Sequence, residues 1–257
     1  MPADDLTLLA DAALAAGAIA RRHFGNGPQT WDKGLGQGPV TEADLEIDVM
    51  LRDTLTGARP DYGWLSEETT DGPGRLTRDR VFIIDPIDGT RAFINGEANF
   101  SHSLAVVERG RPVAAAVYLP MKDRLYLAAA GRGATRNGAA IAPSGKVTLD
   151  GATVLGSKSN FNDVFWHGGR PPVRPQFRSS LAYRLALAAE GRFDAMITLR
   201  DAWEWDIAAG ALLVAEAGGT IVDRRGGPLR FNNARPLLDG VVAGTPDVAR
   251  AILDRLV

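Results

Sequence analysis

Acidic side chains at four places along the chain carry the clearest chemical signal. Each place lies where an apolar run meets turn-forming residues: Asp44, the pair Glu67 and Glu68, the pair Asp85 and Asp88, and Asp206. Two carboxylates held close together repel each other unless a proton or a cation lies between them. Hard oxygen ligands select Mg²⁺ or Mn²⁺, and Mg²⁺ commonly joins a few carboxylates to a substrate phosphate. The pattern therefore indicates carboxylate chemistry around a divalent cation.

The segment Asp85-Pro86-Ile87-Asp88-Gly89-Thr90 is the most informative of these places. The apolar run 81–84 predicts a buried strand that stops abruptly at Asp85. Pro86 stiffens the exit and brings Asp88 round on the same turn. Gly89 and Thr90 can turn backbone N–H groups toward an anion. Two residues separate the aspartates, which excludes the Asp-x-Asp pattern of aspartyl-phosphate phosphatases.

Each acidic group also has an ordinary structural explanation when it is taken alone. Asp-Pro and Asp-Gly are common turn formers. Asp206 precedes an apolar run and could be the N-cap of a helix. Asp44 stands three residues after Thr41, which is the spacing of a capping box. Glu67 and Glu68 could be solvated surface charges. The hypothesis of a metal site rests on the combination.

Composition excludes several other chemistries. The chain has 257 residues, is 45% hydrophobic and 23% charged, and carries a formal net charge of −2. It has no cysteine and only three histidines, His23, His102 and His167, which excludes thiol nucleophiles and His-rich metal sites. Near-neutral charge argues against a nucleic-acid partner, and no apolar run is long enough to cross a membrane. Because the first apolar stretch follows acidic residues, unlike a signal peptide, we expect a cytoplasmic protein.

The hydrophobic pattern predicts two kinds of architecture in sequence. Helices are expected at 5–24, after Thr41 with Leu45, Val49 and Leu55 on one face, and at 180–190, 206–217 and 246–256. Strands are expected at 81–84, 103–107, 113–119, 125–129, 153–155, 193–198, 220–222 and 240–243. The Gly-rich stretch 25–39 is expected to be a mobile loop that closes over the site. Hairpins followed by βα alternation predict an α+β domain at 1–150 and an α/β domain at 151–257.

The acidic segments together resemble the inositol monophosphatase-like superfamily of Mg²⁺-dependent, lithium-sensitive phosphatases. The matching segments occur in the family's order across essentially the whole chain: Lys33 with residues 39–44, residues 66–68, residues 85–90, and residues 205–210. The resemblance implies the family's layered α-β-α-β-α sandwich. It also implies a phosphoric monoester hydrolase.

Carried over by position, the resemblance assigns roles to individual residues. The implied metal ligands are Glu67, Asp85, Asp88, Asp206 and the carbonyl of Ile87. Asp44 would lie beside a more weakly held ion, and Thr90 with Glu67 or Asp44 would orient the attacking water. The N–H groups of Gly89 and Thr90 would hold the phosphate. The implied cofactor is two or three Mg²⁺ ions, with Mn²⁺ as a substitute and Li⁺ as an inhibitor.

The sequence around the last metal aspartate bears on the substrate. Inositol-specific members have a glutamate seven residues before that aspartate, where this chain has Leu199. Residues 39–44, 65–68 and 88–93 look more like the bacterial 3'(2'),5'-bisphosphate nucleotidase branch, so adenosine 3',5'-bisphosphate is the first expectation. Its second phosphate and purine would suit cationic and aromatic side chains near the mouth of the site. The candidates are Lys158, Arg184, Arg200, Trp203 and Trp205.

Alternatives to this substrate remain open. Inositol monophosphate, histidinol phosphate, fructose 1,6-bisphosphate or another sugar or polyol phosphate would suit the same metal site. A catalytically silent regulatory protein is a further alternative, although every implied ligand position holds a carboxylate. The expected partner is a small phosphate ester, without nucleic acid or membrane, and the resemblance allows a homodimer.

Overall fold

The computed structural model describes residues 4–34 and 38–257. One sheet contains seven strands in the order β3-β4-β5-β6-β7-β8-β9, with only β3 and β4 parallel. These strands are β3 (Gly63–Ser66), β4 (Arg80–Asp88), β5 (Ser101–Glu108), β6 (Arg111–Leu119), β7 (Arg124–Ala129), β8 (Ala134–Arg136) and β9 (Ala139–Ala140). The predicted hairpin and the strand after it are confirmed as β5, β6 and β7.

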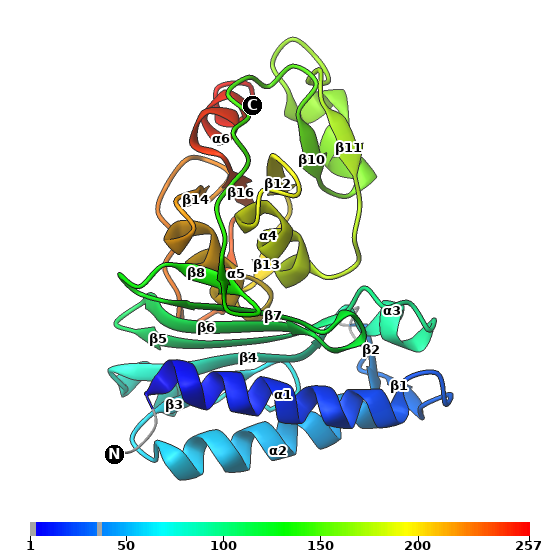
Figure 1. Ribbon diagram of the computed structural model, residues 1–257, viewed down its shortest axis with the longest axis vertical. Coiled ribbons are helices and arrows are strands. Elements are labelled where there is room, and N and C mark those ends of the chain that lie inside the picture. Colours follow the sequence, from blue (N-terminus) through cyan, green and yellow to red (C-terminus); the bar gives the residue numbers. More distant parts are fainter. Residues whose placement is uncertain (1–3, 35–37) are drawn as a thin grey trace.

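Helices cover both faces of this sheet (Figure 1). Helices α1 (Asp5–His23) and α2 (Glu42–Ala58) cover one face. On β4, Phe82 and Ile84 point toward these two helices, whereas Val81 and Ile83 point to the opposite core. This period of two explains why β4 is apolar at every position along this stretch, since it is buried on both faces.

The second sheet contains five strands in the order β11-β10-β12-β16-β14. These strands are β10 (Thr153–Leu155), β11 (Arg174–Gln176), β12 (Ala195–Thr198), β14 (Thr220–Val222) and β16 (Val241–Gly244). Helices α4 (Leu181–Ala189) and α5 (Glu204–Glu216) lie between the two sheets, and α6 (Pro246–Leu253) lies beyond the second (Figure 1). The α-β-α-β-α sandwich is confirmed.

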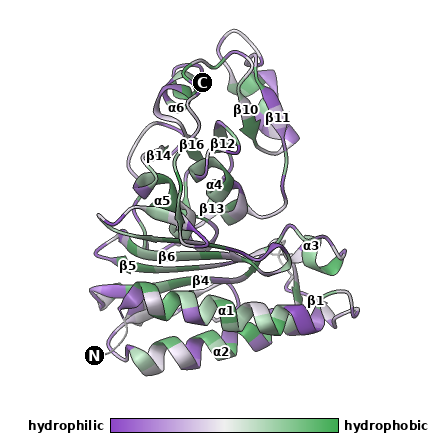
Figure 2. Ribbon diagram, viewed as in Figure 1, coloured by the Kyte–Doolittle hydropathy of each residue, from purple (hydrophilic) through white to green (hydrophobic). Residues whose placement is uncertain are grey.

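The remaining short elements connect these layers. They are β1 (Thr30–Asp32), β2 (Pro39–Thr41), α3 (Thr90–Ile94), β13 (Ala202–Trp203) and β15 (Leu237–Leu238), with 3₁₀ turns at Pro73–Thr77, Pro120–Lys122, Lys158–Phe161 and Asp163–Phe165. Apolar residues concentrate in the strands and in the helix faces turned toward them (Figure 2). The large core between the sheets includes residues from both halves of the chain, and the division into domains at 1–150 and 151–257 stays a prediction.

The buried face of α2 differs from the prediction. Of the predicted face, Leu55 is fully buried, but Leu45 and Val49 are 41% and 60% exposed; Ile47 and Leu51, which the prediction did not name, are fully buried. Both sets satisfy helical spacing, so the periodicity does not choose between them. The observed phase also turns the acidic residues Asp44 and Asp48 inward.

Three further differences from the prediction lie in segments that carry candidate site residues. The stretch 25–39 is not wholly a loop, because β1 pairs with β2 in an antiparallel hairpin; its residues 35–37 lie outside the described part of the chain. Strand β4 continues past residue 84 to Asp88. Helix α5 begins at Glu204, two residues before the predicted start.

Helices α4 and α5 approach each other closely at Gly210. A Cβ atom at this position would lie 2.5 Å from the side chain of Leu185. The absence of a side chain at residue 210 therefore sets the separation of the two helices. Among the described residues, no helix combines the length and apolar character needed to cross a membrane.

Candidate active site

A bulge in β4 brings Asp85 and Asp88 to the same side of the sheet. Asp85 pairs with Ser103 of β5 and Asp88 pairs with Ser101, so two β4 residues lie opposite the single residue His102. In a regular strand, residues three apart point to opposite faces. The extra residue in the bulge cancels this alternation, and both carboxylates reach the side of the sheet that carries α4 and α5.

Asp206 reaches the same place from α5. One carboxylate oxygen from each of Asp85, Asp88 and Asp206 lies within 4.8 Å of the others. Asp206 is the third residue of α5 and Trp203 is the N-cap, so the alternative that Asp206 caps the helix is wrong. Two elements far apart in the sequence thus join in one cluster of three carboxylates.

The electrostatics of this cluster favour a shared proton or a cation. Burial, followed by repulsion from neighbouring carboxylates, raises the pKa of Asp85 and of Asp206 well above the ordinary value. Burial also raises the pKa of Asp88 to about 6, although hydrogen bonds to its carboxylate oppose the shift. Carboxylates forced together in this way are stabilised by a shared positive charge.

The donor set fits a hard divalent cation. Oδ2 of Asp88 accepts hydrogen bonds from Ser180 Oγ and from the Ala182 backbone N–H, both at 2.6 Å, which anchors the carboxylate. Oδ1 of Asp85 is buried and has no hydrogen-bond partner among the described residues. An orphaned buried carboxylate oxygen costs free energy unless it has a ligand. All-oxygen ligands of this kind suit Mg²⁺.

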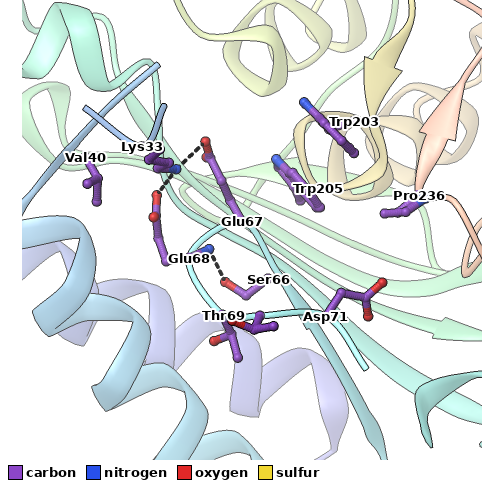
Figure 3. A pocket seen from close by; sticks show the side chains of 11 residues that line it. Lys33, Val40, Ser66, Glu67, Glu68, Thr69, Asp71, Trp203, Trp205 and Pro236 are labelled. Carbon is purple, nitrogen blue, oxygen red and sulfur yellow. Dashed lines mark hydrogen bonds and ion pairs between the residues drawn. The ribbon is translucent and has the colours of Figure 1, made fainter. Parts of the chain in front are cut away.

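Glu67 and Glu68 follow β3 and face Lys33 from the β1–β2 hairpin (Figure 3). Lys33 Nζ lies 2.8 Å from Glu67 Oε1 and 2.6 Å from Glu68 Oε1. The alternative that this pair is solvated surface charge is wrong, because only 20% of the Glu67 side chain and 3% of the Glu68 side chain are exposed. Burial and repulsion by Glu67 raise the pKa of Glu68 to about 8. Glu67 lies outside the group of three carboxylates, but its charge contributes to the raised pKa of Asp85 and of Asp206.

Asp44 has both a capping role and a free oxygen. The capping box with Thr41 is present, since Asp44 Oδ2 accepts from the Thr41 N–H at 2.8 Å and from its hydroxyl at 2.5 Å. Oδ1 of Asp44 is buried and lacks a partner within the described chain. Burial raises the pKa of Asp44 to about 6. The cap therefore leaves one oxygen for another ligand.

The turn after Asp88 contains the predicted phosphate-binding groups. Gly89 has φ +100°, in the left-handed region that glycine favours, and it is the N-cap of α3. Thr90 begins α3, and its hydroxyl donates to the Ile87 carbonyl at 3.1 Å. That carbonyl retains a second lone pair for a cation.

The candidate substrate residues are divided between different surroundings. Trp203 stacks on Trp205 with ring centroids 4.7 Å apart, and both rings line a cavity of about 560 Å³ together with Glu67 (Figure 3). Lys158 is exposed and lines a separate cavity of about 300 Å³. The structure thus places Trp203 beside the acidic site and Lys158 in a different cavity.

The two candidate arginines also differ. Arg184 is buried, and its Nε donates to the Arg178 carbonyl at 2.5 Å while its guanidinium lies 4.6 Å from the centre of the Phe177 ring. Arg200 is exposed, and its positive charge acts on Asp206 to lower that residue's pKa against the larger effect of burial. Arg200 is thus the exposed arginine of the two, whereas the charge of the buried Arg184 acts on Asp88 and opposes the rise in pKa that burial causes in that carboxyl.

Leu199 is not a surface residue of this site. It is 4% exposed, belongs to the core around β12, and its carbonyl accepts a hydrogen bond from Arg224 at 2.8 Å. The exposed residues next to it in this loop are Arg200 and Asp201.

Sequence reasoning missed the residues that support the aspartates. Ser180 was expected only as the start of a helix, which it caps by accepting from the Tyr183 N–H, and nothing in the sequence signals its bond to Asp88. Nothing in the sequence singles out His102 from the other two histidines. Its partner is the carbonyl of Pro86, inside the bulge.

Comparisons with known proteins point to one family. A model of the inositol monophosphatase family matches residues 3–254. The chain is 33% identical to an inositol-1-monophosphatase of Rhizobium meliloti over 96% of its own length and 94% of that protein. It is 36% identical to Nus factor SuhB of Escherichia coli over 83% of its own length and 80% of that protein.

Solved structures give the same result. An IMPase of Thermotoga maritima superposes with a TM-score of 0.82 and 30% identity, covering 98% of this chain and 96% of the other. The family is Mg²⁺-dependent, and the cluster of Asp85, Asp88 and Asp206 provides an acidic centre of the expected kind. The chain belongs to the inositol monophosphatase family and is a phosphoric monoester hydrolase.

Proposed function

We propose that this protein is a Mg²⁺-dependent phosphatase of small polyol monophosphates, with inositol monophosphate as the representative substrate. The observation that carries the proposal is the convergence of Asp85, Asp88 and Asp206, whose oxygens lie within 4.8 Å of one another. The substrate class is supported by relatives named inositol-1-monophosphatase that match along almost the whole chain. The bisphosphate nucleotide expected from the motifs becomes the second candidate.

The proposed metal-binding residues are Asp85, Asp88, Asp206, Glu67 and the Ile87 carbonyl. When bound, Mg²⁺ supplies positive charge that favours ionisation of water and offsets the charge on phosphoryl oxygens. Asp88 holds its ligand oxygen in place because its other oxygen accepts from Ser180 and Ala182. Glu67, which pairs with Lys33 at 2.8 Å, would complete the ligand set.

The proposed substrate-positioning groups lie around this centre. The backbone N–H groups of Gly89 and Thr90 hold the phosphate at the start of α3. The Thr90 hydroxyl, together with Glu67 or Asp44, accepts and orients the protons of the attacking water. Trp203, in the wall of the cavity beside Glu67, offers an apolar face to the alcohol part of the ester.

The proposal includes two or three Mg²⁺ ions, with Mn²⁺ as a substitute. Asp44, which has a free buried oxygen, would serve the more weakly held ion. Li⁺ in the millimolar range is expected to inhibit by occupying that position. A homodimer, cytoplasmic location and the absence of a nucleic-acid partner stay predictions.

The second candidate, adenosine 3',5'-bisphosphate, is favoured by one observation. Arg200 presents its positive charge near Asp206, in a loop where inositol-specific members carry a glutamate. A free cation there suits a substrate with a second anionic group better than it suits a neutral polyol.

Phosphate release tests these candidates directly. Inositol 1-phosphate and adenosine 3',5'-bisphosphate are compared under matched conditions, with Mg²⁺ and with EDTA. A higher kcat/KM for inositol 1-phosphate supports the first candidate, and the reverse order supports the second. Turnover of neither ester, or equal turnover in EDTA, would contradict the proposed function.

A further inference from the structure

Three consecutive residues of β5 make hydrogen bonds to residues that flank or support the three carboxylates. Ser101, His102 and Ser103 are all fully buried and lie opposite the β4 bulge. Because side chains alternate along a strand, the two serines point toward α4 and α5, and the histidine points to the other face.

The serines connect to Asp88 and to the residue before Asp206. Ser180 Oγ has one proton, which it donates to Asp88, so Ser101 Oγ donates to Ser180 at 2.9 Å. Ser103 Oγ donates to the Trp205 carbonyl at 2.8 Å. The two hydroxyls thus tie β5 to the start of α4 and to the first turn of α5.

His102 contacts the bulge itself. Its Nδ1 lies 2.5 Å from the Pro86 carbonyl oxygen, and because a carbonyl can only accept, Nδ1 carries the proton. Burial lowers the pKa of His102 to about 4, so the ring is neutral at physiological pH. A bulge leaves one residue outside the regular ladder of hydrogen bonds. His102 supplies the missing donor to the peptide that joins Pro86 to Ile87, between the two aspartates.

The second ring nitrogen of His102, Nε2, indicates that the hydrogen bond from Nδ1 to Pro86 explains why this residue is a histidine. Nε2 of His102 is buried and has no hydrogen-bond partner in the described part of the chain. Its neighbours include the rings of Phe100 and Tyr118. An apolar side chain would fill this space without leaving an unsatisfied nitrogen. A purely space-filling role therefore does not account for a histidine.

We propose that His102 is a positioning residue for the metal centre, which it serves by holding the Pro86 carbonyl and thereby the spacing of Asp85 and Asp88. Without this donor, the Pro86 carbonyl loses its partner, and the spacing of the two carboxylates is held less tightly. The inference rests on the proposed metal site, since it concerns how that site is kept in shape. It assigns His102 no contact with substrate and no proton transfer.

Isothermal titration of the metal-free protein with Mg²⁺ tests this role without using activity. His102→Leu is expected to weaken Mg²⁺ binding by ~10–100-fold, the range for a lost partner outside the ligand shell. His102→Asn places an amide N–H near the position of Nδ1 and is expected to bind within about threefold of wild type, because it restores the donor. Affinity of the Leu variant within about twofold of wild type would overturn the inference.

Tyr118→Phe is the matched control. Tyr118 pairs with His102 across the β5–β6 ladder and is equally buried, but its hydroxyl contacts Arg21 and Asp123 away from the bulge. This variant is expected to lower Tm and to leave Mg²⁺ affinity unchanged. An equal loss of affinity in Tyr118→Phe and His102→Leu would mean that any damage to this core weakens the site, which would overturn the specific role of His102.

Two further outcomes separate the inference from the proposed function. If His102→Leu does not fold, His102→Asn is compared with His102→Gln, in which the amide lies one bond further from the backbone. Tighter Mg²⁺ binding by the Asn variant than by the Gln variant supports the inference, and equal binding overturns it. If the wild-type protein itself does not bind Mg²⁺, the proposed metal site fails and the inference fails with it. Wild-type binding with unaffected His102 variants overturns the inference alone.

Discussion

Replacing Asp88 by asparagine is expected to change stability and activity in opposite directions. The side-chain carbonyl oxygen of the variant would still accept from Ser180 and Ala182, so the start of α4 keeps its hydrogen bonds. The side-chain amide would then face Asp85 and Asp206, where a carboxylate oxygen now lies within 4.8 Å of both. The substitution thus replaces a repelling charge by a donor.

The magnitude follows from this distance. Two unit charges at 4.8 Å repel by about 3.5 kcal/mol at an effective dielectric constant of ~20. Because the raised pKa values keep part of the cluster protonated near neutral pH, we expect relief of about 2 kcal/mol in the metal-free protein. For a chain of this size, that free energy corresponds to a rise in Tm of ~4–8 °C. Activity is expected to fall by at least ~100-fold, since a direct ligand matters more than its supporting partners.

Thermal unfolding in EDTA and in Mg²⁺, together with phosphate release, measures both effects. Wild-type protein should gain stability from Mg²⁺, and the Asp88→Asn variant should gain little. Asp247→Asn, an exposed aspartate in the first turn of α6, is the control and should behave as wild type. A lower Tm of Asp88→Asn in EDTA, or an undiminished response to Mg²⁺, would refute the reasoning.

Four other perturbations have expected outcomes. Burial raises the pKa values of the site's carboxyls, so the folded metal-free protein binds more protons than the unfolded chain. Its Tm in EDTA should therefore fall as pH rises from 5 to 8, and saturating Mg²⁺ should reduce this slope. A Tm in EDTA that rises over that window would contradict the assignment. Lys33→Met should lower Tm in EDTA, since Glu67 and Glu68 lose the ammonium group that they share. It should also lower the Mg²⁺ concentration for half-maximal stabilisation, because Lys33 no longer competes with Mg²⁺ for Glu67. An unchanged Mg²⁺ midpoint would show that Lys33 does not compete for Glu67. Arg200→Glu should raise the ratio of kcat/KM for inositol 1-phosphate to kcat/KM for the bisphosphate nucleotide; an unchanged ratio would remove Arg200 from substrate recognition. Leu199→Glu should lower Tm, because it buries a carboxylate.

The local sequence pattern predicts where the long strands and helices lie, but it does not predict which face of a helix is buried. The apolar runs of β4, β5 and β6 are long enough to identify each strand, and the cap at Thr41 places α2. The choice between the Leu45 face and the Ile47 face depends on what α2 packs against, which no local spacing encodes. Tertiary contacts decide such cases.

The same division applies to the site. Asp85, Asp88 and Asp206 stand out in the sequence because each lies at the edge of an apolar run. The bulge that brings Asp85 and Asp88 to one face depends on pairing with β5, and the role of Ser180 depends on the approach of α4. Ligands can be found from residue type and spacing, whereas the residues that aim them require the three-dimensional arrangement.

The contact between α4 and α5 at Gly210 influences the active site from inside the protein core. Asp206 is one turn away on α5, and Ser180, which holds Asp88, caps the neighbouring helix that packs there. A methyl group at residue 210 would wedge α4 and α5 apart and widen the gap that the cation must span. Activity would thus fall because the distance between two helices increases, although every polar group of the enzyme is still present.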